Sequence, residues 1–280
     1  MLPYKKVRVF FVFFVFLILS GVSYSSDEAS DRKKPIIVAS TSMIASLVSD
    51  ISGNYFEILN VLPPNACPGH FDLKPKDVLS IRNAALIISH QYQKDLHKAL
   101  RSQVKEEKRW LVLPDEKALT IPDQYLRTGQ GLLKSLKDRF PLQAAGFNNY
   151  WLRSETDIKQ LRDELKKTFK RKISFPCPLI VAYHQKEFVE YWGFRITGVF
   201  DSSGGDSFQA MKTLIDNGSK VKAKAVAANL QTGDKQARVI AEKLGVPVIA
   251  LSNFPGGEPG TSTYQDLLRA NCQKLMKILE

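Results

Sequence analysis

The sequence predicts an α/β protein of two open parallel-sheet lobes, joined by a long rigid helix, with a ligand cleft between them. Short apolar runs alternate with helical patterns from residue 35 to 113, and the alternation resumes from residue 178 to 251. Such alternation indicates parallel sheets with helices on both faces. Between these regions, an apolar stripe at helical spacing runs through Leu161, Leu165 and Phe169. Open sheets of this kind bind ligands beyond the carboxyl ends of their strands, so we expect the cleft there.

The first lobe is expected to span residues 35–153. Its opening strand leads to Thr41 and Ser42, either of which can cap the next helix by accepting a hydrogen bond from a free amide group. The expected strands are 35–40, 56–61, 84–89 and 110–113, and the expected helices are 43–52, 76–83 and 91–104. Residues 114–150 have weak periodicity and several Gly and Pro residues, so we predict loops and short helices there.

The interdomain helix is expected over residues 154–172, and the second lobe over residues 173–280. The helical pattern from Ser154 to Phe169 would span roughly 24 Å, enough to cross between two lobes. The expected strands of the second lobe are 178–183, 195–200, 223–228 and 246–251, and its expected helices are 186–192, 207–217, 234–244 and 263–279. Gly245 stands where the end of a helix favours left-handed backbone geometry.

The amino terminus resembles an export signal. Basic residues precede an apolar run from Val9 to Leu19, and small residues follow. We predict a signal peptide over residues 1–25 and a polar leader over residues 26–34, which would make the mature protein periplasmic. The alternative is an uncleaved membrane anchor, although the apolar run is short for a span of about 20 residues.

The chain is basic, with a formal net charge of +12. Its basic runs at residues 166–172 and 220–224 lack the interleaved aromatic and glycine residues of a single-strand binder. We therefore interpret them as solvated helix ends and loop edges, and we expect no nucleic-acid partner.

Three cysteines leave one thiol unpaired if the other two form a disulfide. Cys177 precedes a predicted strand and Cys272 lies in the last predicted helix. A bond between them is an open question in an oxidising compartment, because spacing does not show whether their Cα atoms come within about 7 Å. Cys67 would then be the odd thiol, which a bound metal would explain.

A stiff loop from Pro63 to Pro75 carries the first candidate ligands. Cys67 and His70 are spaced as Cys-x-x-His, which lets a sulfur and a ring nitrogen converge on one ion. For an arbitrary pair of this kind, a buried thiol beside a surface histidine is the commoner explanation. The same loop contains Asp72, which we interpret as a residue that stabilises the loop rather than as a ligand.

The remaining histidines strengthen the metal hypothesis. His90 and His184 fall at the carboxyl ends of predicted strands in different lobes, whereas His97 lies inside a predicted helix. A thiolate with imidazoles favours zinc or copper over manganese or calcium, which prefer oxygen ligands. Asp201, after the strand 195–200, is a further cleft-facing carboxylate by position, with an ordinary turn aspartate as the alternative.

Four motifs link the chain to a known family. They are Val61-Leu62-Pro63-Pro64-Asn65-Ala66 before a His-Phe-Asp loop, Pro75-x-Asp77, Val181-Ala182-Tyr183-His184 before an aromatic-rich helix and Gly193-Phe194, and Ser262-Thr263-Tyr264 with Arg269-Ala270-Asn271. Over nearly all of the mature chain, the sequence resembles the substrate-binding proteins of zinc- and manganese-type ABC importers. The resemblance implies two α/β lobes joined by a long rigid helix, an ion between them, and delivery to a permease.

The ligand positions that the resemblance implies are altered. The usual first histidine follows Asp-Pro, but here the position reads Cys67-Pro68-Gly69, with His70 one residue later. The second ligand, a histidine two residues before a tryptophan, aligns with Asn149, and the last, an aspartate, aligns on or near Asn253. The third histidine is retained as His184.

Three functions follow as hypotheses. The first is a monomeric periplasmic receptor that captures a divalent metal, with Zn²⁺ favoured and copper or manganese as alternatives, and hands it to an ABC permease in the inner membrane. The second keeps the fold but binds a chelated metal, a tetrapyrrole or another small organic ligand. The third, an exported hydrolase, is disfavoured because the sequence has no nucleophile elbow, no His-Glu-x-x-His and no carboxylate pair in a suitable context. We therefore expect no enzyme.

Overall fold

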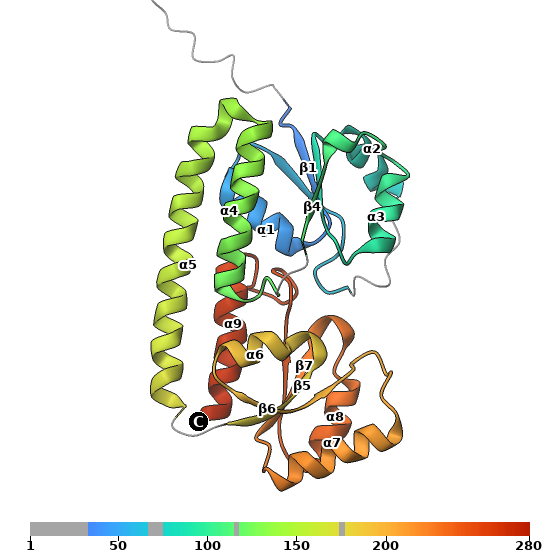
Figure 1. The fold of residues 1–280 in the computed structure, drawn as a ribbon, viewed down its shortest axis with the longest axis vertical. Helices are drawn as coiled ribbons and strands as arrows, with labels where there is room; N and C mark the ends of the chain where they lie inside the picture. The colour runs from blue at the N-terminus through green and yellow to red at the C-terminus, as the bar shows by residue number, and fades with distance from the viewer. Residues whose placement is uncertain (1–32, 67–74, 115–117, 174–176) are drawn as a thin grey trace, which may run out of the picture. The chain divides into compact units, whose positions relative to one another are not determined.

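Two parallel sheets form the framework of the computed structural model, which describes residues 33–66, 75–114, 118–173 and 177–280. Each sheet has four strands, in the orders β2-β1-β3-β4 and β6-β5-β7-β8 (Figure 1). The predicted fold class is therefore confirmed.

The first sheet has helices on both faces. Its elements are β1 (Ile36–Ala39), α1 (Ser42–Ser52), β2 (Glu57–Asn60), α2 (Pro75–Asn83), β3 (Leu86–His90), α3 (Lys94–Arg101), the 3-10 turn η1 (Glu107–Arg109) and β4 (Trp110–Leu113). Alternate residues of β1 enter different cores: Ile37 packs in a cluster with α1, and Val38 packs in a cluster with residues of α2 and α3. Thr41 caps α1 as predicted, because its hydroxyl accepts from the amide of Ile44 at 3.3 Å.

Two long helices occupy the region for which we predicted loops and short helices. They are α4 (Pro122–Arg139) and the 29-residue α5 (Ala144–Lys172), with the turn η2 (Pro141–Gln143) between them. The prediction for residues 114–150 is therefore wrong, and the long helix begins at Ala144 rather than at Ser154. We did not predict α4 because its glycines weaken the helical pattern in the sequence. A Cβ at Gly129 would lie 2.0 Å from the ring of Trp151, so close packing of α4 on α5 requires glycine there.

The second sheet repeats the arrangement. Its elements are β5 (Pro178–Ala182), η3 (Tyr183–Gln185), α6 (Lys186–Tyr191), β6 (Arg195–Phe200), α7 (Phe208–Lys220), β7 (Ala225–Asn229), η4 (Leu230–Thr232), α8 (Lys235–Leu244), β8 (Val248–Leu251), α9 (Tyr264–Met276) and η5 (Lys277–Leu279). Gly245 ends α8 in the left-handed conformation, with φ of 65°, as predicted.

Helices α5 and α9 connect the two sheets. One apolar core contains residues of both sheets, such as Ile37 and Leu179, together with the buried stripe of α5. Tyr264, at the start of α9, stacks on Tyr125 of α4 with ring centroids 3.7 Å apart, and its hydroxyl donates to the carbonyl of Thr120 at 3.1 Å. The two lobes therefore share one continuous apolar core, and we call its helices α4, α5 and α9 the helical spine.

Cys177 and Cys272 are both buried free thiols, so the disulfide that the sequence left open is not formed. Burial raises the pKa of both thiols. The described helices include none with the length and the apolar composition of a membrane-spanning segment.

Candidate metal-binding site

The loops that follow the carboxyl ends of the two sheets contact each other. Ser42, just after β1, donates from its hydroxyl to the carbonyl of Pro255 at 2.7 Å. The side-chain amide of Gln231, just after β7, donates to the carbonyl of Pro64 in the loop after β2 at 3.0 Å. Because ligands of open α/β sheets bind beyond these strand ends, the facing loops form the candidate site.

His90 ends β3 and is buried, with 6% of its surface exposed. Its ring nitrogen Nε2 lies 3.5 Å from the hydroxyl of Thr41, and its ring stacks on Tyr92. Burial lowers the pKa of His90 to about 4. The imidazole is therefore neutral at physiological pH, and a neutral imidazole is the form that binds metals.

His184 lies in η3, directly after β5, and its side chain is exposed. The exposed ring of Tyr183 packs edge-on against it, with centroids 5.4 Å apart. Asp201 follows the neighbouring strand, because Ala182 of β5 pairs with Phe200 of β6. His184 and Asp201 therefore stand at the same edge of the second sheet.

Asp201 is held in a turn. Its Oδ1 accepts from the hydroxyl of Ser203 at 2.7 Å and from the amide of the same residue at 2.9 Å. These hydrogen bonds are the main reason that the pKa of Asp201 lies below its usual value, and the charge of His184 adds to the effect. The role of Asp201 in a turn is thus present.

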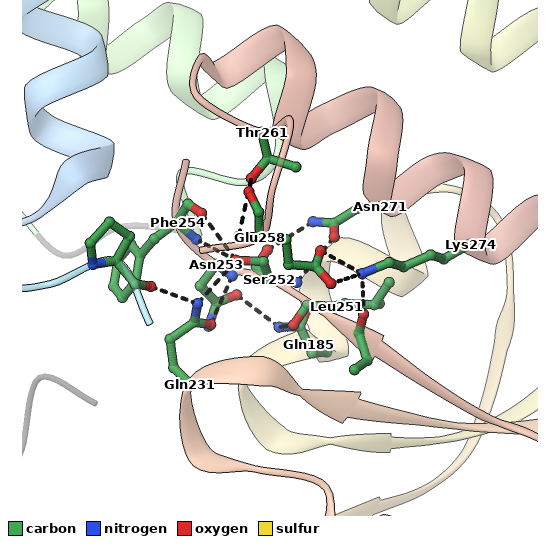
Figure 2. A network of polar contacts seen from close by, with 12 residues as sticks. Gln185, Gln231, Leu251, Ser252, Asn253, Phe254, Glu258, Thr261, Asn271 and Lys274 are labelled. Atoms are coloured by element: carbon green, nitrogen blue, oxygen red, sulfur yellow. Dashed lines mark hydrogen bonds and ion pairs between the residues drawn. The ribbon is translucent and has the colours of Figure 1, made fainter. Parts of the chain in front are cut away.

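Asn253 belongs to a network of amides (Figure 2). Its Oδ1 accepts from Gln185 Nε2 at 2.9 Å, and its main-chain amide donates to Gln231 Oε1 at 3.0 Å. Its Nδ2 donates to Asn229 Oδ1 at 3.2 Å. Both polar atoms of the Asn253 side chain are therefore held by other amides of the second lobe.

The sequence analysis did not predict Gln185, Asn229 or Gln231. Their only common signal is position, because each lies at the carboxyl end of β5 or β7 or in the turn that follows. The same topological rule that selected the histidines would have selected them.

The structure does not bring Asn149 to these loops. Asn149 is exposed on α5, and the ring of its neighbour Tyr150 lies against Gly53, which ends α1. His90 contacts Thr41 at the opposite end of the same helix. An 11-residue helix is about 16 Å long, so Asn149 is remote from His90.

The remaining candidates, Cys67 and His70, lie outside the described residues. Within the part of the chain that the structure describes, no group of three or more His, Cys, Asp or Glu side chains is placed to hold a metal ion.

The two lobes, their shared helical spine and their facing strand-end loops define a two-lobed solute-binding protein. Residues 37–278 match the family model described as "Zinc-uptake complex component A periplasmic" (ZnuA). The chain therefore belongs to this family.

Individual relatives are distant. The manganese ABC transporter substrate-binding lipoprotein PsaA of Streptococcus mitis is 22% identical over 97% of this chain and 98% of its own length. A ZnuA crystal structure has a TM-score of 0.75 at 16% identity, over 89% of this chain and 100% of the other. A manganese-bound periplasmic metal-binding protein from Candidatus Liberibacter asiaticus has a TM-score of 0.74 at 15% identity, over 88% and 100% of the two chains. At these identities the structural likeness shows the fold.

Proposed function

We propose that this protein captures a divalent transition metal outside the cytoplasm and hands it to an ABC permease in the inner membrane. The observation that carries the proposal is the placement of His90 and His184 at strand ends of opposite lobes, in a chain that belongs to the ZnuA family. Metal receptors need ligands from both lobes, since an ion between the lobes then links them.

The proposed ligands are His90 and His184, with Cys67 and His70 from the loop after β2. Asp201, at the same sheet edge as His184, is a further candidate, while Asn253 and Asn149 are left out on the contacts described above. Imidazole and thiolate ligands favour zinc or copper over manganese, and the matching family model describes zinc uptake. Zn²⁺ is therefore the proposed cargo.

The proposal also includes the cellular location, the oligomeric state and the partners of the protein. Residues 1–25 act as a signal peptide, so the mature protein works in the periplasm. It functions as a monomer and catalyses no reaction, and its partners are the metal and the permease rather than nucleic acid.

Calorimetry on chelator-treated protein tests the proposal. We expect one tight site for Zn²⁺ per chain and weaker binding of Mn²⁺. His184→Ala is expected to weaken zinc binding by at least about tenfold, because one ligand is lost. His97→Ala is the matched control, since His97 lies on α3 and accepts a hydrogen bond from Arg101. If no first-row metal binds tightly, or if both variants bind like the parent, the proposal is wrong.

Exposed aromatic side chains support the second candidate function, a chelated metal or a tetrapyrrole as cargo. Tyr183, directly after β5, and Phe208, at the start of α7, are 66% and 84% exposed. Flat organic ligands stack on such rings. Titration with haem, followed by absorbance, separates the two functions: saturable haem binding without a tight zinc site would favour the organic ligand.

A further inference from the structure

Gln231 uses its whole side-chain amide in hydrogen bonds, and one of them joins the two lobes. Its Nε2 donates to the carbonyl of Pro64 at 3.0 Å and to the hydroxyl of Ser252 at 3.0 Å, while its Oε1 accepts from the main-chain amide of Asn253 at 3.0 Å (Figure 2). The side chain is buried, with 8% of the residue exposed. A buried amide with all of these contacts is held in one orientation.

The acceptor, Pro64, lies at the start of the loop whose sequence contains Cys67 and His70, two of the proposed ligands of the first lobe. The contact there is close, because a Cβ added at Gly256 would lie 3.3 Å from Pro64 Cγ. Gly256 has φ of +77°, a conformation that favours glycine. The loop after β8 is therefore shaped to receive Pro64.

Within the second lobe, further hydrogen bonds connect Gln231 to the residue beside His184. Its neighbour Gln185 is fully buried and donates to Asn253 Oδ1 at 2.9 Å. Asn253 is in turn held by Gln231. A continuous chain of hydrogen bonds thus runs from the residue beside His184, through Asn253 and Gln231, to Pro64.

From this geometry we propose that Gln231 is a positioning residue: it fixes the ligand-bearing segments of the two lobes relative to each other and thereby slows metal release. The inference rests on the proposed function. Gln231 does not touch the metal in this account, because its oxygen and both of its N–H groups are already used by protein groups.

Two variants test the role. Gln231→Glu keeps the acceptor for Asn253 but replaces the donor to Pro64 with an oxygen, and Gln231→Met keeps the length while it removes the hydrogen bonds. Gln273→Glu is the control, because Gln273 is exposed on α9. Both variants lose the hydrogen bond to Pro64, the one that joins the lobes, so we expect both to release Zn²⁺ about tenfold faster, which corresponds to about 1.4 kcal/mol for that bond.

Amide hydrogen exchange at Leu62, Asn65 and Ala66, which flank or follow the two prolines, supplies a second readout in the metal-free protein. Exchange should accelerate in both Gln231 variants while circular dichroism and the melting temperature of the metal-free protein stay close to those of the parent. Parent-like zinc release and parent-like exchange in either folded variant would overturn the inference and leave the proposed function intact. If the parent protein binds no metal, the proposed function fails, and the inference about metal release fails with it even where exchange accelerates.

Discussion

Asp50 provides a quantitative test of the packing that joins α1, α4 and α5. Its Oδ2 accepts from the hydroxyl of Tyr125 at 2.7 Å, and its Oδ1 accepts from the hydroxyl of Ser154 at 3.3 Å. Burial raises the pKa of Asp50 from 3.8 to about 6, and the charge of Asp157 adds to the shift. The folded protein therefore binds a proton at Asp50 more tightly than the unfolded chain does.

The sign of the pH dependence follows from this difference. Between about pH 4 and pH 6 the folded state holds the extra proton, so the Asp50 contribution to stability falls as pH rises and is fully lost above about pH 6. A shift of about 2 units corresponds to at most about 3 kcal/mol.

Asp50→Asn removes the charge but retains polar atoms for Tyr125 and Ser154. We expect the variant to be more stable than the parent by about 1–3 kcal/mol at pH 7, with the gain shrinking toward zero near pH 4. Urea unfolding at pH 4, 5, 6 and 7 measures the difference. Asp138→Asn, at an exposed position of α4, is the control. A gain that does not change with pH, or a loss of stability at pH 7, would refute the reasoning.

Three further perturbations test the spine and the site. Gly129→Ala should destabilise the protein by about 1–3 kcal/mol because its Cβ would meet Trp151, whereas Gly131→Ala, with nothing within 4 Å, should stabilise it by about 0.5–1 kcal/mol. Thermal melts decide this pair, and equal shifts would contradict the packing. Burial lowers the pKa of His90 to about 4, so its contribution to stability is present above about pH 6.5 and is lost as pH falls through 4. His90→Gln should therefore lose less stability than the parent on acidification in urea titrations, and parallel curves would contradict the assignment. Tyr264→Phe removes the hydroxyl that donates to a carbonyl just before α4 and should cost about 1 kcal/mol in the same assay, and an unchanged midpoint would argue against that hydrogen bond.

The sequence was sufficient for the sheets because strand signals are local. Apolar runs such as 178–182 and 225–229 are buried on both faces and stand out from their flanking helices. Thr41 and Gly245 mark helix ends by mechanisms that act within a few residues. These features could therefore be predicted without knowledge of the packing.

Helix α4 could not be predicted in the same way. Gly129 lowers the intrinsic helix propensity, and only the contact with Trp151 on another helix explains why glycine is favoured there. A tertiary contact overrides the local preference in this case.

The candidate site likewise combines positions that could be predicted from the sequence with contacts that could not. His90 and His184 lie at the carboxyl ends of strands, as we predicted from the apolar runs that precede them. We did not predict the amides that surround Asn253. Gln185 and Gln231 contact Asn253 from positions 68 and 22 residues away, so their partnership exists only in the folded protein. Asn149 was aligned by its position two residues before Trp151, and Trp151 is buried in the apolar core on α5, away from the strand-end loops.

The most direct measurement of the central claim is a crystal of the protein grown with zinc and measured at the zinc absorption edge. We expect one strong anomalous peak between the lobes, with a ring nitrogen of His184 about 2.0–2.1 Å from it. A crystal without such a peak, or a peak held only by surface residues remote from His184, would contradict the account.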